Sequence, residues 1–246
     1  MRYFIEVAYL GTNYSGFQVQ KNANTIQAEI EKAFFIIRKQ EVTLTCSSRT
    51  DAGVHALQNY FHFDVDGKIS PNFLYNINSV LPNDIVVKKI VATKNESHCR
   101  FDADSREYKY FIYQQKNPFL KDRAYYFPFK LDLEKLKEAA AVIKEYTDFT
   151  SFSKKNTQVK TFNCTIYKSE WLVEDGCLIY NVKGNRFLRG MVRALVATML
   201  KVGRDKISIA QFRKIIESKD CKQAHFAVPA QGLFLVAVNY PENTMP

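Results

Sequence analysis

The 246-residue sequence contains little glycine and little proline, nine and seven residues respectively. This scarcity excludes collagen-like repeats and low-complexity linkers, which need far more of both residue types. No apolar run approaches the roughly 18 to 20 residues that a bilayer-spanning helix requires. Glu6 interrupts what would be the apolar region of a signal peptide, and no small-residue cleavage pattern follows it. The sequence therefore predicts a soluble, cytoplasmic protein with no membrane partner.

Motifs for cofactors and metals are missing as well. Neither Gly-x-Gly-x-x-Gly nor Gly-x-x-x-x-Gly-Lys-Ser/Thr occurs, so no nucleotide cofactor is expected. The four histidines form no His-Glu-x-x-His motif, and the five cysteines form no Cys-x-x-Cys pair. We therefore expect buried free thiols, no metal ion and no cofactor.

Acidic residues are outnumbered by basic ones. The chain has 35 Lys and Arg against 25 Asp and Glu, a formal charge of +10, and 14% aromatic residues. A basic, aromatic-rich chain favours a polyanionic partner such as a nucleic acid. The same excess of positive charge can also serve solubility alone, so the distribution of the charges must decide.

One long segment has no acidic residue at all, from Gly176 to Arg204. Residues 187–202 within it have the period of a helix, and its apolar residues fall on one face. Basic residues follow the other face: Arg186, Arg189, Arg193, Lys201 and Arg204. Surface helices normally pair charges of opposite sign at i,i+4, which is impossible here. This pattern favours phosphate binding by Arg186, Arg189 and Lys201, whereas Arg193 could equally face a buried carboxylate.

The remaining periodicities predict an α+β protein with mixed, largely antiparallel sheets. Expected strands cover residues 2–9, 42–46, 60–65, 85–91, 106–115, 163–173, 177–183 and 233–240. Expected helices cover residues 26–37, 70–81, 131–146, 187–202 and 208–218, with Asn24 as a candidate cap of the first. We expect two subdomains, residues 1–104 and 105–246, which flank a basic cleft.

A polar turn, Arg49-Thr50-Asp51-Ala52-Gly53, separates two of the expected strands. Aspartate is an ordinary turn former, so composition alone favours a structural role for Asp51. His55 follows two residues after Gly53 and could form an acid–base pair with Asp51. We favour a hydrogen bond that anchors the turn as the role of His55.

The segment Arg49 to Ala56, RTDAGVHA, resembles the G-R-T-D-A-G-V-H-A motif of the tRNA pseudouridine synthase A family. Ser48, Phe17 and Leu10 replace the glycine, tryptophan and aspartate that are usual in the family. Further blocks occur in the family's order and span nearly the whole chain: Ala8-Tyr9, Gly11-Thr12, Tyr14, Gly16-Phe17-Gln18-x-Gln20, Leu81-Pro82-x-Asp84-Ile85, His98-x-Arg100-Phe101, Arg106-x-Tyr108-x-Tyr110, Asn185-x-Phe187-Leu188-x-x-Met191-Val192-Arg193 and Pro229-Ala230-x-Gly232-Leu233-x-Leu235.

This resemblance implies the pseudouridine synthase fold, a homodimer, and isomerisation of uridine in the tRNA anticodon stem-loop, at nucleotides 38, 39 and 40, without a cofactor. It implies that Asp51 is the nucleophile and that Tyr108 stacks on the flipped base. It also implies that Arg49 holds the RNA and that Arg193 pairs with the catalytic carboxylate. Whether Asp51 attacks C1′, attacks the base or assists formation of a glycal stays open.

Three other functions compete with this interpretation. A non-catalytic RNA-binding or chaperone relative would explain the basicity, but it has no need of a carboxylate facing phosphate. A synthase could also act on a different RNA. A metal-dependent nuclease would need converging carboxylates, and Asp64 and Asp66 follow Asp51 in the sequence without any ligand pattern.

Overall fold

The computed structural model describes residues 1–155 and 159–242, which form two compact units. The first unit combines residues 1–104 with the chain from Phe234 onward, and the second is Ser105–Leu233. The boundary expected from the sequence puts residues 234–242 in the second half. They belong to the first unit because β9 (Leu233–Asn239) pairs in parallel with β3 (His55–Asp64), where His55 opposes Phe234. Because the two strands are so far apart in the sequence, no local pattern predicts that they pair.

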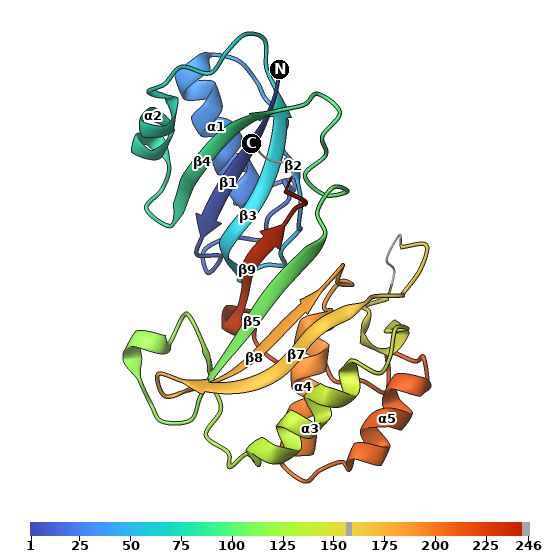
Figure 1. The fold of residues 1–246 in the computed structure, drawn as a ribbon. Helices are drawn as coiled ribbons and strands as arrows, with labels where there is room; N and C mark the ends of the chain where they lie inside the picture. Colours follow the sequence, from blue (N-terminus) through green and yellow to red (C-terminus); the bar gives the residue numbers. More distant parts are fainter. Residues whose placement is uncertain (156–158, 243–246) are drawn as a thin grey trace. The chain divides into compact units, whose positions relative to one another are not determined.

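The sheet of the first unit is centred on β1 (Arg2–Tyr9) and β3. Strand β1 runs antiparallel to both β3 and β4 (Ile85–Thr93). The short β2 (Thr45–Cys46) and β9 both pair with β3 (Figure 1). Strand β2 covers only the end of the predicted strand 42–46, and β3 begins five residues before the predicted start at residue 60.

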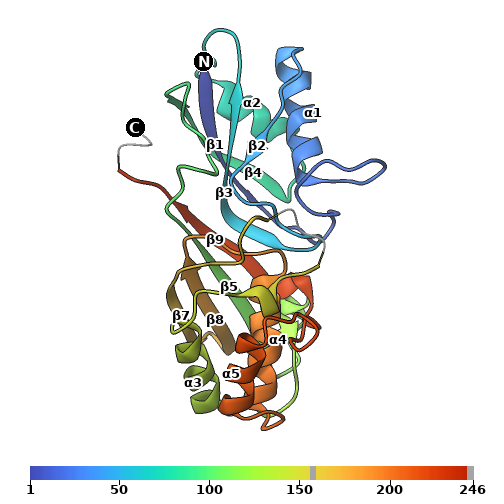
Figure 2. The ribbon, with the colours of Figure 1, turned by 90° about the vertical axis from the view of Figure 1, so that its right-hand side faces the viewer.

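Helices α1 (Ile26–Arg38) and α2 (Phe73–Val80) pack against this sheet (Figures 1 and 2). Phe34 of α1 joins them, because its ring lies 4.7 Å from Phe63 of β3 and 4.9 Å from Phe73 of α2. The side chain of Thr25 caps α1 by accepting a hydrogen bond from the Ala28 N–H. The predicted cap, Asn24, is therefore wrong by one residue.

The sheet of the second unit contains β5 (Ser105–Tyr113), β8 (Cys177–Gly184) and β7 (Ile166–Glu174) in antiparallel order. The short β6 (Tyr125–Tyr126) runs parallel to β5. Asp175 and Gly176 connect β7 to β8, both with positive φ, as the tight hairpin turns of twisted strands require. The predicted hairpin is thus confirmed.

Helices α3 (Leu133–Ile143), α4 (Met191–Gly203) and α5 (Ile209–Glu217) pack together beside the second sheet (Figure 1). Single-turn 3₁₀ helices occur at Pro118–Leu120, Thr150–Phe152 and Ala230–Gly232. The strand pairing is mixed and mostly antiparallel, and together with the packed helices it confirms the predicted α+β class. No helix among the described residues has the length and apolar character needed to cross a membrane.

Candidate active site

Asp51 opens a tight four-residue turn in the first unit. The Val54 N–H donates to the Asp51 carbonyl at 3.1 Å, and Gly53, at the third position, has φ +75°. A turn with positive φ at that position strongly favours glycine. Asp51 is half-buried and Arg49 is exposed. Both residues therefore lie just before β3, Asp51 at the first position of the turn and Arg49 on the segment that leads into it.

The segment that follows β1 holds this turn from one side. The Phe17 N–H donates to the Thr50 carbonyl at 3.1 Å, and the Gly53 N–H donates to the Tyr14 carbonyl at 3.3 Å. A Cβ atom on Gly16, which has φ +102°, would lie only 3.0 Å from the Thr50 carbonyl oxygen. Glycine at position 16 therefore permits the close approach of the two backbones.

A buried polar network supports the residues on either side of Arg49. The hydroxyls of Tyr9 and Thr50 lie 2.8 Å apart. The amide of the fully buried Asn59 donates to the Ser48 carbonyl at 2.9 Å and to the Tyr9 hydroxyl at 3.3 Å. Buried hydrogen bonds of this kind are costly to break, so the backbone around Arg49 and Asp51 is fixed before any ligand arrives.

His55 anchors the turn, as the sequence predicted. Its side chain is fully buried, and its Nδ1 accepts a hydrogen bond from the Gly11 N–H at 3.0 Å. The ring also packs against Phe234 of β9, with 4.5 Å between ring centroids. These contacts give His55 a structural role in joining three segments of the first unit.

Asp64 and Asp66 do not combine with Asp51 into a nuclease-like metal site. Two nitrogens of Arg2 bind the carboxylate of Asp64, at 2.9 and 2.7 Å, and this hydrogen bonding lowers the pKa of Asp64. Within residues 1–155 and 159–242, the group of three metal-ligand side chains that lies close enough to share an ion contains none of these aspartates. No group of three or more carboxylates therefore converges in the part of the chain that the structure describes.

Tyr108 lies on β5 of the second unit and differs from its neighbours on that strand. Its ring is half-buried and meets Phe187 edge to face, with centroids 5.1 Å apart at 80°. Tyr110 is fully buried and donates its hydroxyl proton to the Pro229 carbonyl at 2.7 Å. Tyr113 is also buried. Tyr110 and Tyr113 are thus core aromatics, whereas Tyr108 keeps an accessible surface.

Arg193 lies in α4 and is fixed by a backbone carbonyl. Its Nε and Nη2 both donate to the Val228 oxygen, at 2.9 and 2.6 Å. A guanidinium has five N–H donors, so this contact sets the direction of the group without using all of them. The half-buried Arg193 can therefore also bind an anionic group.

The predicted cationic helix face is wrong. Helix α4 begins at Met191, because Gly190 takes the left-handed conformation with φ +76°, so Arg186 and Arg189 precede the helix. Nearly all of α4 is buried, and only Arg193 and Lys201 keep partial exposure. Arg189 is exposed and Arg186 is half-buried.

The basic residues of this segment have partners that are not acids. Lys201 contacts Nε2 of His225, and burial together with this positive charge lowers the pKa of His225. The guanidinium of Arg204 lies over the ring of Phe129, 4.1 Å from its centroid, in a cation–π contact. Lys201 and Arg204 therefore have partners inside the protein, although the segment contains no acidic residue.

The structure places the predicted site residues in both units. Arg49 and Asp51 lie within three residues of each other in the first unit, and the second unit contains Tyr108, Arg193, Arg186, Arg189 and Lys201. Sequence reasoning did not identify Asn59 or Phe187 as supporting residues. Gly11 and Gly16 lie in segments that resemble the family's sequence, but nothing in the sequence shows which part of the backbone each of them approaches.

Comparison with known proteins gives consistent matches. The profile of a family described as tRNA pseudouridine synthase matches residues 5–102 and 146–241. The chain is 45% identical to tRNA pseudouridine synthase A of Parabacteroides distasonis, over 100% of this chain and 98% of that protein. It is 43% identical to the protein of the same name from Porphyromonas gingivalis, over 98% of both chains. It is 40% identical to that of Staphylococcus aureus MRSA252, over 100% of this chain and 94% of the relative.

Proposed function

We propose that this chain, which belongs to the tRNA pseudouridine synthase family, isomerises uridine to pseudouridine in tRNA. The reaction breaks the N1–C1′ bond of uridine, turns the detached base and joins C5 to C1′. A proton leaves C5 and N1 gains one, so the reaction needs neither a redox change nor an energy source. The single observation that carries the proposal is the fixed turn that begins with Asp51 at the start of β3, with the exposed Arg49 on the segment just before it.

Asp51 is the nucleophile in this proposal. A carboxylate that forms a covalent bond with the substrate divides one difficult step into two easier ones. The hydrogen bonds on both sides of the turn support this role, because a fixed nucleophile needs little reorganisation before it attacks.

Tyr108 is the residue that stacks on the target base. A uridine in a helical stack cannot present its glycosidic bond, so the nucleotide must flip out and find a flat partner. The ring of Phe187 meets Tyr108 edge to face and fixes its orientation. The Tyr108 hydroxyl can then accept the proton that leaves C5.

The two arginines have separate roles. Arg49, which is exposed, stacks and hydrogen-bonds in the gap that the flipped nucleotide leaves. By the family resemblance, Arg193 pairs with the catalytic carboxylate, since a guanidinium matches a carboxylate through two parallel hydrogen bonds. The contact of Arg193 with the Val228 carbonyl supports this role by fixing the guanidinium.

The finer assignments rest on the family resemblance. We propose that the substrate nucleotides are 38, 39 and 40 of the anticodon stem-loop, that the enzyme acts as a cytoplasmic homodimer, and that Arg186, Arg189 and Lys201 contact phosphates. Sedimentation at micromolar concentration tests the dimer. A single species of 28.5 kDa would contradict it.

The decisive experiment compares Asp51→Asn with Asp66→Asn on unmodified tRNA. Pseudouridine is mapped by carbodiimide-dependent primer-extension stops, with no cofactor added. We expect Asp51→Asn to abolish product while tRNA affinity changes by less than about tenfold, because the amide keeps the shape of the carboxylate but is not a nucleophile. Asp66 is exposed and outside the turn, so its variant should keep wild-type activity.

Thermal unfolding must accompany this assay, because loss of a carboxylate can leave a partly buried arginine unpaired. If folded Asp51→Asn protein still forms pseudouridine at an appreciable fraction of the wild-type rate, Asp51 is not the nucleophile. If the wild-type protein binds tRNA but forms no pseudouridine, the chain is a non-catalytic RNA-binding relative.

A further inference from the structure

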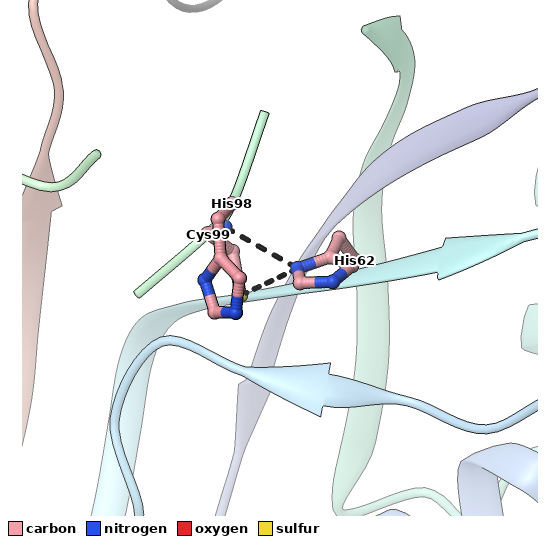
Figure 3. Close-up of side chains that lie close together, drawn as sticks. All are labelled: His62, His98 and Cys99. Carbon is pink, nitrogen blue, oxygen red and sulfur yellow. Dashed lines mark hydrogen bonds between the residues drawn. The ribbon is translucent and has the colours of Figure 1, made fainter. Parts of the chain in front are cut away.

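A histidine–cysteine cluster lies in the first unit, apart from the turn of Asp51. His62 belongs to β3, and His98 and Cys99 belong to the loop that follows β4 (Figure 3). The imidazole nitrogens and the thiol of the three side chains lie within 4.8 Å of one another. Nothing in the proposed reaction uses these side chains.

We propose that His62, His98 and Cys99 bind one divalent transition-metal ion of the zinc type, with a water molecule as the fourth ligand. Two imidazoles and a thiolate are ligands that Zn²⁺ and Co²⁺ prefer, whereas Mg²⁺ and Ca²⁺ prefer oxygen. Binding releases the Cys99 thiol proton to solvent, since the thiolate is the form that coordinates.

The distances between two of the three ligands fit a tetrahedral site. Nδ1 of His62 lies 3.2 Å from Sγ of Cys99. Zinc bonds of about 2.0 Å to nitrogen and about 2.3 Å to sulfur place two tetrahedral ligands about 3.5 Å apart. The separation of this pair is within a few tenths of an ångström of that spacing.

Existing hydrogen bonds already orient the pair. The Cys99 N–H donates to Nδ1 of His62 at 3.3 Å, and the Cys99 thiol donates to the Thr45 carbonyl at 3.0 Å, so both ligand atoms are held in place by bonds that an ion replaces when it binds. The hydroxyl of Tyr240 donates to the Cys99 carbonyl at 2.6 Å and fixes the loop from the other side. Such fixed surroundings are typical of metal ligands, whose supporting bonds set the coordinating atom.

His98 supplies both the third ligand and the opening of the site. His62 and Cys99 are buried, 6% and 0% exposed, whereas His98 is partly exposed. Nδ1 of His98 accepts from the Arg100 N–H at 3.1 Å, and the ring must exchange this bond for the metal when it turns inward. An ion can therefore enter past His98, on the side where water completes the coordination.

Charges near the cluster are balanced. Arg2 and Arg100 act on the histidines as positive charges, and Asp64 and Asp102 act as negative ones. Asp64 binds Arg2, and the Asp102 carboxylate accepts a hydrogen bond from the backbone N–H of His98 at 2.7 Å. A metal–thiolate centre with one net positive charge therefore joins an environment that is not strongly cationic.

Cobalt titration of the chelator-treated 246-residue protein tests the proposal. A Co²⁺–thiolate bond gives a sulfur-to-metal charge-transfer absorption, and Zn²⁺ should displace the Co²⁺. We expect one equivalent to bind to the wild-type protein with this absorption, and Cys99→Ala to lose it. Cys46→Ala is the matched control, because Cys46 lies on the neighbouring strand β2 and should leave the absorption unchanged.

His98→Gln is the second variant, chosen because a partly exposed side chain can be changed with little effect on folding. It should weaken Co²⁺ binding beyond the roughly 10- to 100-fold that loss of an outer-shell partner causes. No stoichiometric binding by the wild-type protein would overturn the proposal. So would an absorption that persists in Cys99→Ala or disappears in Cys46→Ala, or unchanged affinity in His98→Gln.

Discussion

The α-carbon of Gly11 lies directly against the backbone of Val54. A Cβ atom at position 11 would be 2.7 Å from the Val54 carbonyl carbon and would overlap its oxygen. Val54 closes the turn that begins at Asp51, and the Gly11 N–H binds His55. The conformation of the turn that begins at Asp51 thus depends on a residue far earlier in the chain.

Gly11→Ala should therefore displace the turn. We expect a loss of about 1–3 kcal/mol in the free energy of unfolding, because the alanine methyl group meets backbone that cannot rotate away. Pseudouridine formation should fall more than tRNA binding. Thr12→Ala is the control, since Thr12 is exposed and adjacent. Equal denaturation midpoints for the two variants would show that the close approach is not required.

Tyr108→Phe should separate stacking from proton transfer. The phenyl ring keeps the contact with Phe187, so tRNA affinity should persist. If the hydroxyl takes the C5 proton, single-turnover rates should fall by about 100-fold or more, the usual size of a general-base contribution. Tyr167→Phe, on an exposed residue of β7, should change neither quantity. A wild-type rate in Tyr108→Phe would assign the proton transfer to another group.

Arg186 and Arg189 should account for part of the salt dependence of tRNA binding. The double variant Arg186→Gln/Arg189→Gln should lower the log–log slope of affinity against salt by roughly one unit for each phosphate that the protein no longer neutralises. Lys201→Gln should have a smaller effect, because Lys201 already contacts His225. Lys137→Gln serves as the control, since Glu134 binds Lys137 at 2.8 Å. An unchanged slope in the double variant would remove these arginines from the RNA interface.

The pH dependence of stability should contain a contribution from the protonation of His225. Burial and the charge of Lys201 hold the pKa of His225 below its usual value of about 6.5. The unfolded chain therefore binds a proton more readily than the folded chain, and stability falls as the pH drops below about 6.5. His225→Gln should reduce the loss of Tm between about pH 8 and about pH 5 by the order of 1–2 °C. The same loss in both proteins would contradict this contribution.

Local features of the sequence predict most elements and the central turn. The alternation in residues 2–9 and the hairpin around Gly176 occur in the structure as β1 and as the β7–β8 pair, because period and turn chemistry act within a few residues. The RTDAGVHA segment points to Asp51 through the family resemblance, because the residues of that motif are contiguous in the sequence. Tyr110 and Tyr113 are also predictable as strand aromatics, and both pack in the core.

Tertiary structure decided what the local pattern could not. Helical periodicity continues through Arg186 and Arg189, but the positive φ of Gly190 makes the helix begin only at Met191, and α4 is buried on almost every side. The non-acidic partners of Lys201 and Arg204 belong to other segments of the chain. The contacts of Gly11 with Val54 and of His62 with Cys99 also join residues that are far apart in the sequence. The sequence by itself determined which residues carry groups that can react, bind a ligand or bear a charge. Packing between residues far apart in the chain determined which of those groups are buried, paired or presented, because each depends on the free energy of contacts that no local window contains.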